Sequence, residues 1–276
     1  MNKKLQFRLF LRSFFLQTSW NYMKYQNIGL AFVMWPFLKQ LYKNDSQALP
    51  AVMKRYLDNF NTQPVMASFC FGVLAKEEER LKNTPLNSER YKYALAEWNA
   101  IKQNLSITTA SIGDRLFWGS LKPLTLLLAL FIWLSLDVNF LEVDNLPQTV
   151  PPVYIFGGII AAFLAFNIIA LFVKWKGISL GYYAAENACF GLTRFDWNKT
   201  IYYAKRCGVL LTAFMLFFAG YYFLKDFHSV PDVHFIARAA VIVCFVLLSF
   251  VTRKLRVPNM YLYLSAIIIF NIVCLL

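Results

Sequence analysis

The sequence has few of the residues that enzymes most often use for chemistry. Its two histidines are His228 and His234, and neither has a neighbouring cysteine or a metal-ligand spacing. The five cysteines form no CxxC pair, which favours small buried side chains over disulfides or metal ligands. There is also no phosphate-binding glycine loop, no Gly-x-Ser-x-Gly and no HExxH motif. The chain therefore shows no catalytic constellation, and we expect neither a metal site nor another cofactor.

Acidic residues are also scarce, with 15 Asp and Glu against 28 Lys and Arg. Residues 1–122 hold 17 of the bases and 8 of the acids, so the N-terminal half is the more basic one. Basic charge suits an anionic membrane surface, and because no nucleic-acid-binding motif accompanies it, we expect no nucleic-acid partner. Arg8 and Arg12 interrupt the apolar N-terminal stretch and no A-x-A site follows, which argues against a signal peptide.

Long apolar runs dominate the rest of the chain, and 58% of all residues are hydrophobic. Soluble domains usually contain about 45–50% apolar residues, so the composition predicts an all-α integral membrane protein. Four runs are about as long as a membrane-spanning helix. A fifth run is shorter and reaches that length only if the preceding Leu116–Trp118 are included. We thus expect about five transmembrane helices, at Leu124–Leu136 (the short run), Val153–Val173, Cys207–Leu224, Phe235–Val251 and Val257–Leu276.

The loop charges predict an orientation. The segment Asp137–Pro152 carries three acids and no base, whereas Lys174–Arg206 carries six bases and Thr252–Arg256 three more. By the positive-inside rule the acidic segment is external and the two basic segments are cytoplasmic. The N-terminal half would then lie on the cytoplasmic side of the membrane and the C-terminus outside.

We expect residues 1–110 to form an N-terminal helical region and residues 111–276 a membrane-spanning region, both within a single integrated domain. Phe7, Phe10, Leu11, Phe14 and Phe15 recur at helical spacing beside basic residues, which is typical of an amphipathic helix in the membrane interface. The runs Ile28–Leu38 and Val65–Ala75 are too short to span and suit buried or re-entrant elements. The charged segment Lys76–Lys102 predicts solvated cytoplasmic helices.

A charged pair stands at the start of the first apolar run. In Ile112-Gly113-Asp114-Arg115-Leu116-Phe117-Trp118-Gly119, closing at Pro123, glycines and proline predict a broken or re-entrant helix. Asp114 and Arg115 either pair with each other or meet a solute or a partner's charge. Trp118 either stacks on a sugar ring or anchors the interface.

Two further polar clusters are candidates for the same site. Asn61-Thr62-Gln63-Pro64 is typical of a helix start, with Asn61 or Thr62 as the cap, and its amides could also face a polar solute. Polar side chains within the preceding aromatic stretch either line a polar contact or hydrogen-bond neighbouring helices. These are Gln17, Asn21, Gln26 and Asn27.

These clusters resemble the signatures of a known family. Arg12–Asn21 followed by Gln26–Phe32, then Phe60–Ala67, then Ile112–Gly119 resemble, in order and spacing, three motifs of the IID membrane component of mannose/fructose/sorbose-type phosphotransferase systems (PTS). The resemblance implies a membrane subunit that pairs with a IIC subunit to form a sugar path, assembled as a trimer of IIC–IID pairs. Separate IIA and IIB proteins would carry the phosphoryl group to a hexose-type sugar.

The resemblance also implies roles for individual residues. Asn61, Thr62, Gln63, Asp114 and Trp118 would line or shape the path. Arg115 departs from the family, where a small residue or proline usually follows the aspartate, and it could alter specificity or gate the path.

Further departures leave an alternative open. Ser106–Ser111 replaces a glycine- and proline-rich approach, and Ala184 and Ala185 stand where glycine is frequent in the family. With Arg115, these changes also fit a transport-inactive scaffold or regulator that retains the IID fold.

Overall fold

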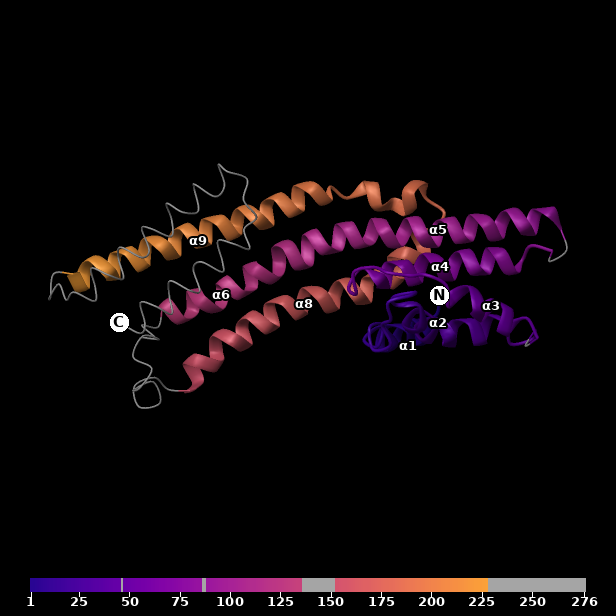
Figure 1. Cartoon of the computed structure of the whole chain (residues 1–276), viewed down its shortest axis with the longest axis horizontal. Helices are drawn as coiled ribbons and strands as arrows, with labels where there is room; N and C mark the ends of the chain where they lie inside the picture. The colour runs from indigo at the N-terminus through magenta and orange to yellow at the C-terminus, as the bar shows by residue number, and fades with distance from the viewer. Residues whose placement is uncertain (46, 86–87, 136–151, 228–276) are drawn as a thin grey trace. The chain divides into compact units, whose positions relative to one another are not determined.

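The computed structural model describes residues 1–45, 47–85, 88–135 and 152–227, and every regular element within them is a helix. The chain divides into two units, Met1–Ala213 and Phe214–Leu276, and the packing described below lies in the first. In chain order the elements are α1 (Lys3–Ser13), α2 (Asn27–Leu41), α3 (Leu49–Tyr56), α4 (Ala67–Lys82), α5 (Glu89–Gly113), the π-helix η1 (Asp114–Leu121), α6 (Lys122–Ser135), α8 (Pro152–Ala184), the 3-10 segment η3 (Ala188–Arg194) and α9 (Trp197–Phe227) (Figure 1).

Within the residues that the structure describes, two stretches of helix are long and apolar enough to cross a membrane, Glu89–Trp133 and Phe156–Ala184. They lie side by side, with α6 against α8, and the ring of Phe117 meets that of Phe166 at 6.4 Å (Figure 1). Large apolar side chains on both remain exposed, which suits a lipid environment. The predicted runs Phe235–Val251 and Val257–Leu276 fall outside the described residues, as does most of Asp137–Pro152, so the five spans and their orientation stay predictions.

The predicted break at Ile112–Pro123 is wrong, because α5, η1 and α6 follow one another without interruption from Glu89 to Ser135. The helix widens instead: the N–H of Lys122 donates to the carbonyl of Phe117, five residues earlier. A π turn of this kind accommodates one extra residue and lets the chain pass Pro123, whose missing N–H removes only a single bond. The same continuous helix runs across residue 110, where we placed the boundary between two regions.

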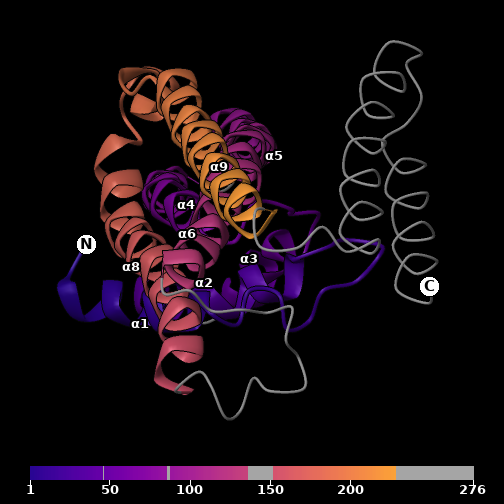
Figure 2. The same ribbon diagram turned by 90° about the vertical axis from the view of Figure 1, so that its left-hand side faces the viewer.

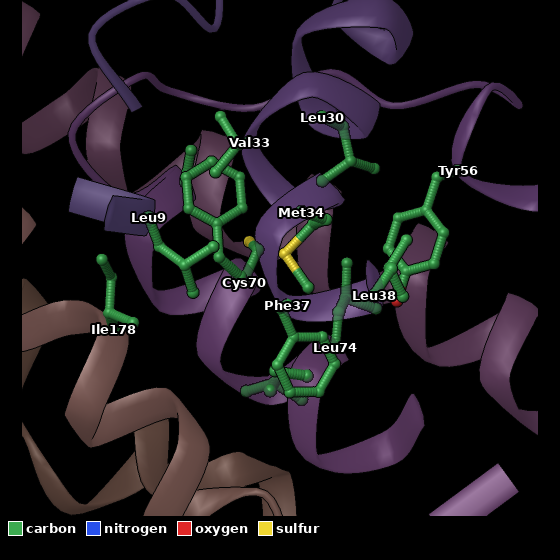
Figure 3. Close-up of a cluster of buried hydrophobic side chains, with 14 of the residues drawn as sticks. Leu9, Leu30, Val33, Met34, Phe37, Leu38, Tyr56, Cys70, Leu74 and Ile178 are labelled. Atoms are coloured by element: carbon green, nitrogen blue, oxygen red, sulfur yellow. The ribbon is translucent and has the colours of Figure 1, made fainter. Parts of the chain in front are cut away.

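The short apolar runs form the core rather than re-entrant segments. Ile28–Leu38 lies within α2, which continues through Pro36 to Leu41, and Val65–Ala75 supplies the start of α4. Side chains from α1, α2, α3, α4 and α8 meet in one cluster (Figure 3). Its labelled members are Leu9, Leu30, Val33, Met34, Phe37, Leu38, Tyr56, Cys70, Leu74 and Ile178.

Helix α1 turns the predicted apolar face away from this core. Leu5 and Leu9 are buried against the cluster, whereas Phe7, Leu11 and Phe14 are 47–49% exposed. A helix with two apolar faces, one buried in protein and one open, fits the expectation that the open face enters a membrane interface.

Helices α4 and α8 approach so closely that glycine is required where they touch. A Cβ on Gly181 would lie 2.1 Å from the carbonyl oxygen of Phe69, and one on Gly72 would lie 2.1 Å from that of Ile178. Small residues allow helix backbones to come this near, as they do in membrane helix pairs. The two helices run in the same direction, because Ser68 lies near Gly177 and Lys76 pairs with Glu186. Figure 2 shows α4 between α8 and α5.

We expect Gly181→Ala to destabilise the protein by about 1–3 kcal/mol, because the added methyl group forces α4 and α8 apart. Thermal unfolding in detergent, followed by size-exclusion chromatography, measures the loss. Gly157→Ala is the matched control on the same helix, since a Cβ there meets nothing within 4 Å. Equal melting temperatures for the two variants would contradict the close approach.

The charged segment Lys76–Lys102 is less solvated than we predicted, because Glu78 is fully buried. Its carboxylate pairs with Arg55 and accepts hydrogen bonds from the hydroxyls of Tyr42 (2.7 Å) and Tyr56 (3.0 Å). Burial, and next the Glu78 charge, raise the pKa of both tyrosines, so their hydroxyls remain protonated donors. The indole ring of Trp98 covers the Arg55 guanidinium at 5.4 Å. Sequence alone could not reveal this, because the partners of Glu78 lie 22–36 residues away.

We expect Glu78→Gln to cost about 3–5 kcal/mol of stability, because it leaves the Arg55 charge buried without its partner. Glu89→Gln is the control, since it removes the same charge from an exposed pair with Lys92. Chemical denaturation monitored by tryptophan fluorescence compares the variants. Similar losses of stability in both variants would show that the buried ion pair contributes no more than the exposed one.

Candidate functional site

The turn before α4 is organised by the side chain of Gln63. Its Oε1 accepts hydrogen bonds from the backbone N–H groups of Val65 (2.7 Å) and Met66 (2.9 Å). Helix α4 begins at Ala67 with Met66 as its N-cap and has no side-chain capping bond, so the predicted cap at Asn61 or Thr62 is wrong. The Gln63 side chain caps the turn that precedes the helix instead. Because Gln63 is buried, these backbone donors are satisfied without water.

Gln26 fastens this turn to the start of α2. Its Nε2 donates to the Thr62 carbonyl oxygen at 2.8 Å, and its Oε1 accepts from the Thr62 N–H at 3.0 Å. The backbone N–H of Gln26 also donates to the Phe60 carbonyl at 2.9 Å. Gln26 in the first motif thus binds the second motif through both its side chain and its backbone.

Two asparagines of the first motif hold the loop that carries Gln26. Asn21 donates to Oδ1 of Asn27 at 2.9 Å, and Asn27 donates to the Leu57 carbonyl at 2.7 Å. The Gln17 side chain is exposed, and its backbone carbonyl accepts a hydrogen bond from the Trp20 N–H. Asn21, Gln26 and Asn27 are therefore hydrogen-bonded within the protein, and Gln17 lies outside this network.

Helix α5 brings the third motif to the same place. The hydroxyls of Thr62 and Thr109 lie 2.7 Å apart, and Sγ of Cys70 lies 3.1 Å from the Thr109 hydroxyl. One turn later, a Cβ on Gly113 would lie 2.5 Å from Cβ of Gln63. We call Gln26, Thr62, Gln63, Thr109 and Gly113 the three-motif junction.

Thr109 and Cys70 were missed by the sequence reasoning. Thr109 stands four residues before Gly113, and hence on the same face of the helix, which is the signal that could have found it. Burial raises the pKa of the Cys70 thiol to about 12, so it is a packed, uncharged side chain.

The exposed members of the predicted site lie beside the junction. Asn61 precedes Thr62, and Asp114 follows Gly113 into the π-helix; both side chains are exposed. Trp118 is 48% exposed, with the Lys122 ammonium over its ring at 4.4 Å. Thr62 and Gln63, by contrast, are buried and shape the site from within.

Arg115 is directed to another helix. Its Nη1 donates to Oδ1 of Asn198, at the start of α9, at 3.2 Å. Among the ion pairs of the described residues, none joins Arg115 to Asp114, so the local pair we considered does not form there. The Asp114 carboxylate is thus left open to another group.

The junction lies where both long helices change from polar to apolar. Ser68, in the first turn of α4, donates to the Val173 carbonyl at 3.5 Å, and the uncharged part of α8 ends at that residue. On the neighbouring helix the apolar stretch begins at Leu116, just after Gly113. The site is therefore at one boundary of the candidate spans. Its exposed groups are an amide, a carboxylate and an indole, which suit sugar hydroxyls and a sugar ring face.

We expect Gly113→Ala to push the Gln63 side chain out of its capping position and to cost about 1–3 kcal/mol. Hydrogen exchange of the Val65 and Met66 amides, which lose their acceptor, should accelerate. Gly119→Ala serves as the control, because a Cβ there approaches only the Asp114 carbonyl at 3.4 Å. Unchanged exchange in the Gly113 variant would contradict the contact.

Comparisons with known proteins identify the family of the chain. Residues 1–141 match the family described as PTS system mannose/fructose/sorbose family IID component. The mannose-specific EIID component of Escherichia coli K12 is 30% identical over 175 residues, 63% of this chain and 53% of that protein. The fructose permease IID component of Bacillus subtilis is 31% identical over 183 residues, 66% and 57% of the two chains.

A solved structure shares the fold. The mannose transporter ManYZ, in a cryo-EM complex with microcin E492, aligns with a TM-score of 0.55 and 25% identity over 77% of this chain and 69% of that one. The chain spans about half the length of the curated relatives it matches. With the family match covering half of its residues, this chain belongs to the IID components of the mannose/fructose/sorbose family of phosphotransferase systems, which are membrane proteins.

Proposed function

We propose that this chain is a membrane subunit of a PTS sugar transporter and forms the sugar path together with a IIC partner. The observation that carries the proposal is the meeting of the three IID motifs at one boundary of the candidate spans. Buried hydrogen bonds join the first motif to the second, and Gly113 of the third motif packs against Gln63 of the second. Asn61, Asp114 and Trp118 remain exposed beside these contacts. The likeness to ManYZ, a mannose transporter, supports the same role.

The residues divide into two groups by burial. Thr62 and Gln63 are hydrogen-bonded inside the protein and set the shape of the path. Asn61 and Asp114 offer a donor-acceptor amide and a pure acceptor to sugar hydroxyls, and Trp118 offers a ring face. The phosphoryl group comes from IIA and IIB proteins, so this chain contributes transport rather than chemistry to a hexose-type substrate.

The assembly we propose has this chain in the bacterial inner membrane as one half of a IIC–IID pair, with three pairs in the complex. The basic N-terminal half faces the cytoplasm, where IIA and IIB work, and the C-terminus is external. The positive charge of residues 1–122 supports this orientation.

One contact favours a second function. Arg115 replaces the small residue usual in the family and ties η1 to α9 through Asn198. A helix fixed in this way suits a transport-inactive scaffold that holds a partner without passing sugar.

The experiment is phosphoenolpyruvate-dependent phosphorylation of labelled hexoses by vesicles that contain this chain and its cognate IIC, supplied with the soluble PTS proteins. Activity that requires this chain supports the transporter and names the sugar. An assembled complex without activity, beside a working control transporter, supports the scaffold. In that case Arg115→Ala tests whether the arginine blocks the path.

We expect Asp114→Asn and Asn61→Ala each to lower hexose phosphorylation by about tenfold, the effect of losing one strong hydrogen bond to a bound sugar. Assembly with IIC should persist, because both side chains are exposed. Asp58→Asn and Asn59→Ala are matched controls on the exposed loop before the junction. The path role fails if both test variants retain full activity and full assembly.

A further inference from the structure

A basic groove lies between α1 and α2, on the N-terminal part of the unit Met1–Ala213. It measures about 590 Å³, within the usual range for small-molecule sites. Four basic side chains and an indole dominate its lining: Arg8, Arg12, Trp35, Lys39 and Lys43. No acidic residue lines it within the described part of the chain, and none of the ion pairs there uses any of these four bases.

The bases form two facing ladders. Arg8 and Arg12 stand one turn apart on α1, Lys39 lies in the last turn of α2, and Lys43 lies in the turn that follows α2. Arg12 is fixed in place, because its Nη1 donates to the Phe32 carbonyl at 2.8 Å and its guanidinium lies 4.4 Å over the Phe32 ring. Arg8 and Lys39 are exposed and have no such internal contact among the described residues. Paired cations with free donors favour a bound anion.

The position of α1 identifies the kind of anion. Helix α1 crosses α8 where the uncharged run 156–173 ends: Gln6 donates to the Trp175 carbonyl at 2.9 Å, and Lys174 donates to the Ser13 carbonyl at 3.3 Å. The rings of Phe7 and Phe10 lie against Trp175. This crossing places α1 at the boundary between apolar and polar surroundings, the depth of lipid headgroups.

The exposed apolar face of α1 lies next to the basic ladder. Phe7, Leu11 and Phe14 are about half exposed, and in helical projection they follow directly on Arg8 and Arg12. A lipid whose acyl chains cover the phenylalanines would place its phosphate at the groove.

We propose that the groove between α1 and α2 is a specific binding site for the headgroup of an anionic phospholipid. The phosphodiester lies between the Arg8–Arg12 and Lys39–Lys43 ladders, Trp35 supports the headgroup, and the acyl chains run along the open face of α1. The site is separate from the three-motif junction and does not depend on which sugar the transporter carries.

The test compares lipid retention by the full chain, purified in mild detergent with its IIC partner, using native mass spectrometry. Dioleoylphosphatidylglycerol is titrated against dioleoylphosphatidylcholine. The variant Arg8→Gln/Lys39→Gln removes one base from each ladder and spares Arg12, which has a structural contact. The control Lys54→Gln/Arg90→Gln removes the same charges from exposed positions outside the groove. Circular dichroism and co-purification of IIC confirm that both variants fold and assemble.

We expect the wild type to retain phosphatidylglycerol in preference to phosphatidylcholine, and the groove variant to bind it about tenfold more weakly. The control should retain wild-type binding, because its substitutions lie outside the groove. Both variants carry the same total charge, so a purely non-specific attraction to the lipid would fall equally in both.

Four outcomes would overturn the proposal. Equal loss in both variants would mean non-specific attraction, and the absence of preferential retention by the wild type would mean no site. Displacement of the lipid by millimolar inorganic phosphate would indicate a site for free anions. Retention of the lipid by this chain alone, but not by the complex with IIC, would mean that the IIC partner covers the groove.

Discussion

The reciprocal hydrogen bonds between the Gln26 side chain and the Thr62 backbone hold the junction together. Through them the loop before α2 fixes the turn before α4, which directs Gln63 to the first N–H groups of that turn and the Thr62 hydroxyl to Thr109 on α5. All these groups are buried, and a buried polar group without a partner costs free energy, so the set is stable only when it is complete. Asn61 and Asp114 owe their positions at one boundary of the candidate spans to this closed network.

Three further sets of contacts position the other helices of the unit Met1–Ala213. Glycines at 72 and 181 let α4 and α8 run side by side at backbone contact, so the first turn of α4 is level with the end of the uncharged run of α8. The Arg55–Glu78 pair and its two tyrosines then hold α2, α3 and α4 together further along. Helix α1 lies across α8 at Lys174 and Trp175, with one face in the protein and one face open.

Much of this could be predicted from local patterns. The spacing of Phe7, Leu11 and Phe14 indicated an amphipathic helix, and those side chains are the exposed ones. The uncharged run before Lys174 indicated a span, and the three motifs indicated the family. The predictions that were wrong concern how a segment adjusts to its neighbours in the fold. Glu78 lies in a charged segment and is nevertheless buried, because its partners come from other helices. Gly113 and Pro123 suggested a break, but a π turn absorbs the irregularity.

The sequence by itself determined the helical, membrane-bound character of this protein and its membership in the IID family. Those properties follow from hydrophobicity, helical periodicity and short motifs, each of which is local in the chain. Only the tertiary structure decided that the three motifs meet, and that Arg115 reaches Asn198 instead of Asp114. Hydrogen bonds between residues 36 to 83 positions apart depend on how the helices pack, which no local pattern specifies.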